Sequence, residues 1–355
     1  MTATDRRLID PSAPVLVTGG SGYVAGWIVR YLLEDGCTVR ATVRNPDKAT
    51  GLEHLHELAA AYPGKLSLHK ADLLDDGSYT EAMQGCELVI HTASPFLIGK
   101  VGDPYEDLVR PALEGTKNVL DSVEATSSVK RVVLTSSVVA IYGDAVEMKG
   151  KSAFTEADWN TTSSLRHQPY SYSKTVAEQE AWKRAEAQDR WDLVTIHPGL
   201  VLGPSLTTSS ISGSMATMKM FTDYSQATGT ARLEFGIVDV RDVARAHIAA
   251  GFTPEAHGRY LTNSESLSML EISKALRSAF GYRPSFPLIE APKAAVKLVA
   301  PLAGQTREFI DKNVGYPLRF DNSRTVRELG VRFRPARESV VEHFQQMIDD
   351  GLVKG

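Results

Sequence analysis

A glycine-rich turn between a short apolar strand and an amphipathic helix most constrains the fold of this 355-residue chain. Residues 15–17 are apolar, and apolar side chains recur at helical spacing over 23–33. The turn, TGGSGYVA, has glycines where a tight bend and a close approach to a pyrophosphate exclude a Cβ. The start of the helix would face those phosphates. The segment therefore predicts a dinucleotide-binding turn; the alternative is a plain turn between packed elements.

Short apolar segments continue to alternate with segments long enough for helices. The further candidate strands are 38–43, 66–69, 88–91, 131–134 and 193–196. This order predicts a Rossmann-type doubly wound α/β fold with a parallel sheet. After Pro198 the alternation fails. We expect 1–200 to form mainly the dinucleotide-binding Rossmann domain, with returning segments at about 236–262, and 201–235 and 263–355 to form a smaller substrate-binding portion.

Composition excludes several other classes of protein. The chain is 43% hydrophobic and 23% charged, as in ordinary globular proteins, and its net charge of -4 provides no basic field for nucleic acid. It has neither a secretory signal nor a run of roughly 18 apolar residues, so we expect a cytoplasmic protein without a membrane span. The two cysteines, Cys37 and Cys86, lack metal-ligand spacing, and His54 and His56 would point to different sides of a helix, so we expect no metal site.

The end of the second candidate strand indicates which dinucleotide is bound. NAD-binding folds place an acidic residue there for the ribose hydroxyls, whereas a basic residue accommodates the phosphate of NADP. Here 38–44 contains no Asp or Glu, the segment ends in Arg44, and Lys48 follows closely. A guanidinium binds phosphate in bidentate fashion. The pattern favours NADP(H), the alternative being that Arg44 is a solvated surface charge.

Tyr170 and Lys174 form the single YxxxK match in the chain. Four residues apart on a helix, they share one face, where a protonated lysine would lower the pKa of the phenol and promote proton exchange. A helix is expected here after the strand that ends in Thr135, Ser136 and Ser137, and carboxyl ends of parallel strands face the cofactor. The pattern indicates a catalytic Ser-Tyr-Lys group, with either serine as its first member.

Seven segments of the chain resemble the extended short-chain dehydrogenase/reductase family, within it the dihydroflavonol reductase and cinnamoyl-CoA reductase branch. They are VTGGSGYVAGW, VRATVRNPDK, KADLLDDGSY, HTASPF, VVLTSSVVA, YSYSKTVAEQEAW and HPGLVLGP. In character the chain is most similar to the microbial aldehyde and ketone reductases of that branch, because it has Ile141 and Tyr142 where plant flavonoid reductases carry a substrate-binding asparagine.

The resemblance implies a role for each matching residue. The serine is Ser137, with Ser136 as the alternative; it binds the substrate carbonyl, Tyr170 protonates the alkoxide, and Lys174 holds the nicotinamide ribose and tunes Tyr170. Hydride comes from the cofactor. The remaining residues implied to bind NADP(H) are Gly19, Ser21, Gly22, Tyr23, Val24, Arg44 and Lys48 at the phosphates, Asp72 and Leu73 at the adenine, Thr92, Ala93 and Ser94 at the ribose, and Pro198 and Val201 at the carboxamide.

The substrate pocket is expected to include Phe96, Val138 and Tyr142. Met215, Met218, Phe221 and Tyr224 recur at helical spacing and could form an adaptable apolar wall over the substrate, or simply buried core. We interpret His197 as a hydrogen-bonded structural histidine. The charged run 178–190 alternates in sign and predicts a solvated helix face.

Together these patterns predict an enzyme, an NADPH-dependent reductase that converts a ketone or aldehyde to an alcohol, acting as a monomer or homodimer on a small carbonyl substrate. An NAD-dependent nucleotide-sugar epimerase or dehydratase on the same fold is the first alternative. Arg44 argues against it, as does the Val138-Val139-Ala140 run after the serine, where sugar dehydratases carry acidic residues. A non-catalytic NADPH-sensing regulator is the second.

Overall fold

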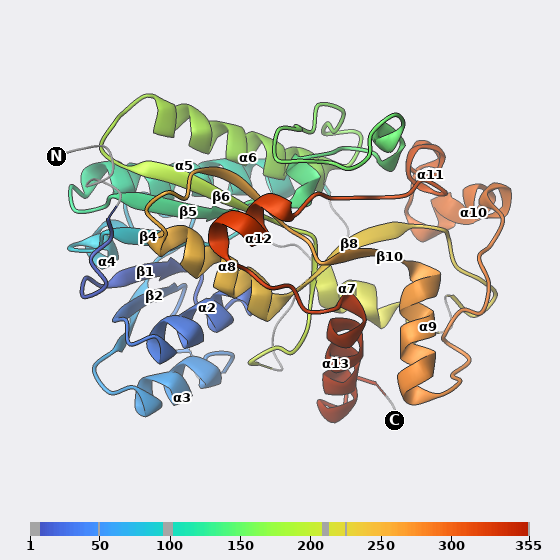
Figure 1. Cartoon of the computed structure of the whole chain (residues 1–355), viewed down its shortest axis with the longest axis horizontal. Coiled ribbons are helices and arrows are strands. Elements are labelled where there is room, and N and C mark those ends of the chain that lie inside the picture. Colours follow the sequence, from blue (N-terminus) through green and yellow to red (C-terminus); the bar gives the residue numbers. More distant parts are fainter. Residues whose placement is uncertain (1–7, 49, 95–101, 208–212, 224–225, 354–355) are drawn as a thin grey trace.

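The computed structural model describes residues 8–48, 50–94, 102–207, 213–223 and 226–353. Its centre is a seven-stranded sheet, parallel throughout, in the order β3-β2-β1-β4-β5-β6-β9 (Figure 1). The strands are β1 (Val15–Thr18), β2 (Val39–Val43), β3 (Leu66–Lys70), β4 (Leu88–His91), β5 (Arg131–Thr135), β6 (Asp192–Pro198) and β9 (Gly258–Thr262). The predicted Rossmann-type α/β fold is confirmed.

Helices cover both faces of this sheet, on opposite sides of it in Figure 1. One layer contains α2 (Tyr23–Glu34), α3 (Glu53–Ala61) and α8 (Val240–Phe252), and the other contains α4 (Thr80–Met83), α5 (Arg110–Ala125) and α6 (Pro169–Glu186). Along β1, Val15 and Val17 pack into the first layer and Leu16 into the second. Because both faces are buried, the central strands are continuously apolar, and for this reason they were recognisable in the sequence.

A smaller sheet follows β6, with strand order β10-β8-β7. Its strands are β7 (Leu200–Leu202), β8 (Glu234–Asp239) and β10 (Glu265–Ser268). Within the returning segments expected at about 236–262, β9 joins the main sheet beside β6 and α8 packs on one face of that sheet, whereas β8 pairs with β7 and β10. The proposed domain boundaries stay a prediction.

The smaller sheet packs against helices α9 (Met269–Phe280) and α13 (Ala336–Asp349) around an apolar core that includes Phe221, Phe286 and Phe344. The other elements are η1 (Tyr105–Val109), η2 (Val138–Ala140), η3 (Ala145–Met148), α7 (Gly213–Lys219), α10 (Lys293–Val299), η5 (Ala300–Ala303), α11 (Arg307–Asn313) and α12 (Ser323–Leu329). Among the described residues no helix has the length and apolar character to cross a bilayer.

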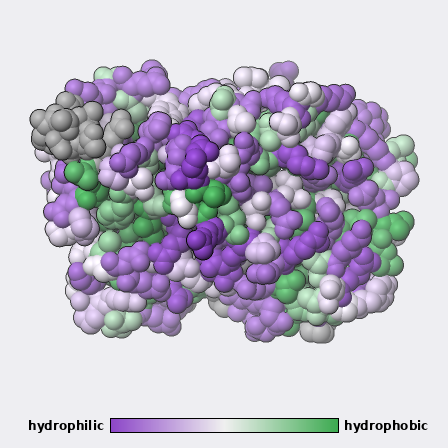
Figure 2. Space-filling view, viewed as in Figure 1, coloured by the Kyte–Doolittle hydropathy of each residue, from purple (hydrophilic) through white to green (hydrophobic). Residues whose placement is uncertain are grey.

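The face shown in Figure 2 is largely hydrophilic, with apolar side chains gathered at a few places. On α10 and η5, Leu298, Val299 and Leu302 are each more than half exposed. These residues are remote in sequence from the segments that build the site described next.

Candidate active site

The glycine turn is packed tightly between two strand ends. Gly19 has φ +67°, and a Cβ there would lie 3.0 Å from the Cα of Ala93; a Cβ at Gly20 would lie 2.8 Å from the Cβ of Ala41. Gly22 caps α2 without any side-chain hydrogen bond, and the first turn of α2 contains no acidic residue. The backbone N–H groups at the start of α2 are thus suited to an anion. The turn fits a pyrophosphate.

Hydrogen bonds join β1 to β4 where the strand order reverses. Thr18 Oγ1 lies 2.8 Å from His91 Nδ1 and accepts from the backbone N–H of Ala93 at 3.1 Å, while Thr92 Oγ1 donates to the carbonyl of Thr18 at 2.6 Å. These contacts hold Thr92 and Ala93 beside the glycine turn; their expected place at the cofactor ribose stays a prediction. Ligands of open α/β sheets bind at such a reversal point.

Arg44 directly follows β2, and both Arg44 and Lys48 are exposed. Neither forms an ion pair with another residue in the described part of the chain. Asp72 lies in the turn after β3, where its Oδ1 accepts from Leu74 N at 2.9 Å and Asn118 Nδ2 binds the carbonyls of Asp72 and Leu73. Two unpaired cations at the end of β2 suit a ribose phosphate.

The predicted catalytic residues come from β5 and α6. Ser137 follows β5 and caps η2, which packs against α6. Tyr170 lies in the first turn of α6 and is 38% exposed. One turn further, Lys174 Nζ donates to Ser94 Oγ at 2.9 Å, at the carboxyl end of β4. The fold thus brings the three catalytic candidates to the edge of the sheet where the glycine turn lies.

The two candidate serines have different surroundings. Ser136 is 6% exposed and donates its hydroxyl to Glu178 Oε2 at 2.5 Å. Ser137 is partly exposed, and its Oγ accepts a long 3.4 Å bond from Val139 N, which leaves the O–H able to donate. The geometry favours Ser137 for contact with a substrate.

Burial controls the proton affinities of the tyrosine and the lysine. It raises the pKa of Tyr170 to about 12 and lowers the pKa of Lys174 to about 8, although the carboxylate of Glu178 opposes the second shift. The lowered phenol pKa expected from a neighbouring lysine is therefore not found here: desolvation is the cause of the raised pKa of Tyr170. Near neutral pH Tyr170 carries its proton and can donate it.

Glu178 is a buried charged residue beside the candidate site that the sequence interpretation missed. The prediction of a solvated face is wrong at this position: Glu178 is 1% exposed and binds His197 Nε2 and Arg259 Nε, each at 2.8 Å, in addition to Ser136. Burial opposes ionisation, but His197 and Arg259 outweigh it and lower the pKa of Glu178 to about 2. The expected structural role of His197 is confirmed. The position of Glu178 four residues after Lys174, on the same helix face, was the available signal.

The expected substrate-pocket residues do not lie together in the structure. Met218 and Phe221 are fully buried in the core of the smaller sheet, the alternative that the sequence left open, and Met215 packs against that core. Val138 is buried, and Tyr142 stacks on Phe154 with ring centroids 5.0 Å apart. Phe96 and Tyr224 lie outside the described residues.

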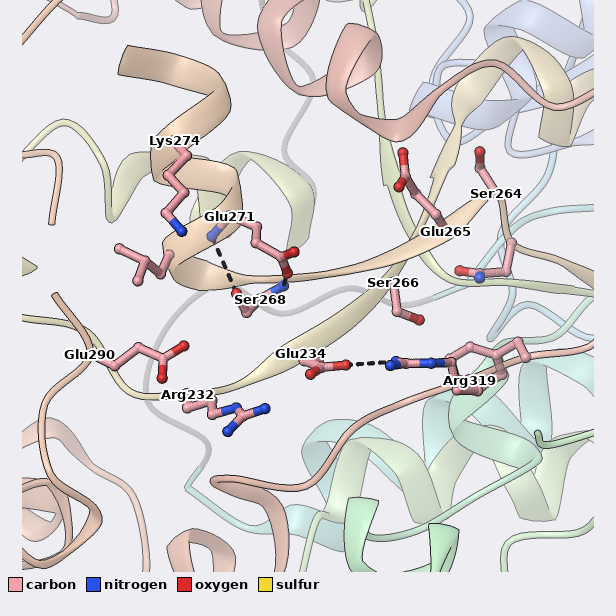
Figure 3. Close-up of a pocket in the computed structure, with 13 residues that line it drawn as sticks. Arg232, Glu234, Ser264, Glu265, Ser266, Ser268, Glu271, Lys274, Glu290 and Arg319 are labelled. Atoms are coloured by element: carbon pink, nitrogen blue, oxygen red, sulfur yellow. Dashed lines mark hydrogen bonds and ion pairs between the residues drawn. The ribbon is translucent and has the colours of Figure 1, made fainter. Parts of the chain in front are cut away.

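Two cavities lie near these elements. A small one of about 20 Å³ is lined by several predicted site residues, namely Leu73, Ala93, Ser94 and Lys174. A wider hollow of about 680 Å³ lies over the smaller sheet, where Figure 3 shows charged side chains such as Arg232, Glu234 and Arg319 around it. None of the predicted site residues lines that hollow. Pro198 is the buried last residue of β6 in the main sheet, and Val201 lies in β7 of the smaller sheet. Within the described ranges no cluster of side chains could hold a metal ion.

Comparison with known proteins assigns the family. The model of the NAD dependent epimerase/dehydratase family matches residues 15–260, and the chain belongs to that family. It is 37% identical to cinnamoyl-CoA reductase 1 of Petunia hybrida, over 95% of this chain and 92% of that one, and 37% identical to tetraketide alpha-pyrone reductase 1 of Arabidopsis thaliana, over 96% of each. Yeast methylglyoxal/isovaleraldehyde reductase Gre2, solved with NADPH, superimposes with TM-score 0.77 at 26% identity, covering 96% of this chain and 100% of that chain. The resemblance noted from the sequence is confirmed.

Proposed function

We propose that this protein reduces a small aldehyde or ketone with NADPH and that Tyr170 delivers the proton. At the coarser level the chain is an NADP-dependent oxidoreductase, as predicted, because its curated relatives are reductases and a structural neighbour holds NADPH. The finer assignment of proton donor and substrate is the proposal.

The hydrogen bond from Lys174 to Ser94 carries this proposal. It anchors the lysine at the carboxyl end of β4, beside the strand ends that flank the glycine turn. Tyr170 stands one helical turn earlier and reaches the surface, and η2, which begins after Ser137, packs on the same helix. A carbonyl group held between Ser137 and Tyr170 would thus lie near the nicotinamide end of the bound cofactor.

Each residue then has one task in the reduction. NADPH, when bound, supplies the hydride to the carbonyl carbon. Ser137 donates a hydrogen bond to the carbonyl oxygen and stabilises the negative charge that develops there. Tyr170, protonated at neutral pH because its pKa is about 12, gives its proton to that oxygen. Lys174, charged below a pH of about 8, stabilises the phenolate that remains.

The residues after Ser137 bear on the substrate class. Ile141 is 1% exposed and Tyr142 packs into an aromatic cluster with Phe154 and Phe320, so neither offers the amide that plant flavonoid reductases use. We therefore propose small aldehydes and ketones rather than flavonoids. The yeast neighbour is named for methylglyoxal and isovaleraldehyde, which supports starting with such compounds.

The test is to follow NADPH absorbance with isovaleraldehyde, methylglyoxal, acetophenone, a β-keto ester and a UDP-sugar, each repeated with NADH. We expect oxidation of NADPH with at least one aldehyde or ketone and a weaker rate with NADH. Conversion of the UDP-sugar without net cofactor change would replace the proposal with the epimerase alternative. Tight NADPH binding with every compound inert would support the regulator alternative.

A further inference from the structure

The residue two positions before Tyr170 has an unusual backbone. Gln168 has φ 55° and ψ 58°, and among the described residues no other non-glycine residue has a positive φ. It caps the amino end of α6 and is followed by Pro169, which itself disfavours helical backbone in the preceding residue. A strained conformation at such a place persists only if its surroundings hold it, and strain of this kind concentrates at functional sites.

Two contacts of the Gln168 side chain provide that hold. Its Nε2 donates to the carbonyl of Gly143 at 2.5 Å and to Asp144 Oδ1 at 2.8 Å. Gly143 and Asp144 belong to the segment that leaves Ser137 through η2. A Cβ at Gly143 would overlap Thr162 Oγ1, so this segment is itself closely confined. The Gln168 side chain thus joins the start of the Tyr170 helix to the segment that carries Ser137.

Asp144 is the centre of this arrangement. Its carboxylate is 1% exposed and also accepts from His167 Nε2 at 2.9 Å and from Asn313 Nδ2 at 2.6 Å. Asn313 is the last residue of α11, and its Oδ1 accepts a hydrogen bond from the backbone N–H of Ala145 at 2.9 Å. Lys312 Nζ lies 3.7 Å from the same carboxylate. A buried carboxylate that accepts this many hydrogen bonds holds the segments that donate them in a rigid arrangement.

We propose that Asp144 and Gln168 are positioning residues, which set the first turn of α6 so that the Tyr170 hydroxyl faces the carbonyl held by Ser137. Neither residue touches the reacting atoms, and the proposal rests on the proposed function of Tyr170. Through Asn313, the carboxy-terminal segment contributes to the same alignment. Misplacement of a reacting group by about 1 Å can cost about 100-fold in rate, so loss of these contacts would slow proton delivery.

The variants are Asp144→Asn, Gln168→Ala and Gln168→Gly, with Asp242→Asn as the matched control. Asp242 is also a buried aspartate, 2% exposed, and it accepts a hydrogen bond from the backbone N–H of Arg334. It lies on α8, on the other face of the main sheet from α6. Gln168→Gly loses the side-chain contacts but adopts the positive φ without strain. Gln168→Ala loses the same contacts and is still strained at a positive φ. The assay measures kcat with NADPH and the best carbonyl compound of the panel, the solvent deuterium isotope effect on kcat, and the Kd for NADPH.

We expect Asp144→Asn and Gln168→Ala to lower kcat by about 10- to 100-fold, with Gln168→Gly intermediate. The solvent isotope effect should increase, because proton transfer becomes limiting, and the Kd for NADPH should stay within twofold. Asp242→Asn should change none of these quantities. If Asp144→Asn does not fold, the two variants Gln168→Ala and Gln168→Gly test the positioning role.

Unchanged kcat and isotope effect in Gln168→Ala would overturn the positioning role. A Tyr170→Phe variant in the same series separates the two claims. If Tyr170→Phe is inactive while Gln168→Ala is normal, only the positioning role fails. If Tyr170→Phe retains the wild-type rate, the proposed function fails first.

Discussion

Ser136 and Glu178 are hydrogen-bonded to each other in the interior, with the serine hydroxyl 2.5 Å from Oε2 of the carboxylate. This contact occupies one of two adjacent serines and links the end of β5 to α6, one turn beyond Lys174. The next residue, Ser137, stays partly exposed at the start of η2. We therefore expect these adjacent serines to have separable roles, Ser136 in stability and Ser137, as proposed, in the reaction.

The serine pair gives the first prediction. Ser137→Ala should lower kcat by about 100- to 1,000-fold, the usual effect of removing a hydrogen bond to a developing oxyanion, with little change in thermal stability. Ser136→Ala should instead lower the free energy of unfolding by about 1–3 kcal/mol and keep most of kcat. Steady-state kinetics and urea unfolding of the two variants measure both effects. The reverse pattern would make Ser136 the catalytic serine.

The charge of Glu178 should stabilise the fold. Glu178→Gln keeps the shape but leaves His197 and Arg259 without a buried anion, so we expect a loss of about 3–5 kcal/mol in the free energy of unfolding at pH 7. The pKa of Glu178 lies near 2, below its ordinary 4.5, so this stabilisation is complete above 4.5 and is lost as the pH falls from 4.5 towards 2.

Urea unfolding at pH 7 and at pH 3 measures the Glu178 effect, and the gap between wild type and variant should narrow at the lower pH. The matched control is Glu180→Gln, two residues along α6, whose ion pairs with Lys183 and Arg184 lie nearer the surface. That variant should lose less than about 1 kcal/mol. Equal losses in both variants would show that the buried charge has no special role.

The pH dependence of reduction should follow Lys174. Burial lowers its pKa to about 8, so the lysine is charged below that pH and loses its charge as the pH rises through it. Tyr170 keeps its proton throughout, since its pKa is about 12. The rate of carbonyl reduction should therefore be flat below pH 8 and decrease above it. In Lys174→Arg, any residual activity should show no such decrease, because arginine stays protonated; a decrease at the same pH would assign it to another group.

Arg44 should select the phosphorylated cofactor. Arg44→Ala removes an exposed guanidinium at the end of β2, and we expect the Kd for NADPH to increase by about 10- to 100-fold with little change for NADH. Arg30→Ala, on α2, removes an arginine that pairs with Glu34 and should change neither value. Fluorescence titration of both cofactors measures this. A parallel increase for NADH would mean that Arg44 does not contact the extra phosphate.

The sequence was informative where local pattern decides structure. The strands β1, β4 and β5 each contain an unbroken run of three apolar residues because both faces of the sheet are buried, so 88–91 was located to the residue and the other strands to within a few. The glycine turn was visible because φ +67° at Gly19 and the close approach of Ala93 require glycine.

Other features depend on partners distant in the chain. The burial of Glu178 depends on Arg259, 81 residues later, so its charge pattern alone indicated an exposed face. The place of β8 was decided by pairing with β7 and β10. The hydrogen bond between Gln168 and Asp144 joins residues 24 positions apart, so no periodic pattern in the sequence indicates it.

The most direct test of the proposed reduction follows the hydride and the proton together. The protein is incubated with NADPH carrying deuterium at both C4 positions of the nicotinamide and with the best carbonyl compound of the panel, and the alcohol is analysed by mass spectrometry. We expect one deuterium on the former carbonyl carbon, and a loss of at least about 1,000-fold in rate in Tyr170→Phe with NADPH binding unchanged. An alcohol without deuterium, or an unchanged rate in Tyr170→Phe, would contradict it.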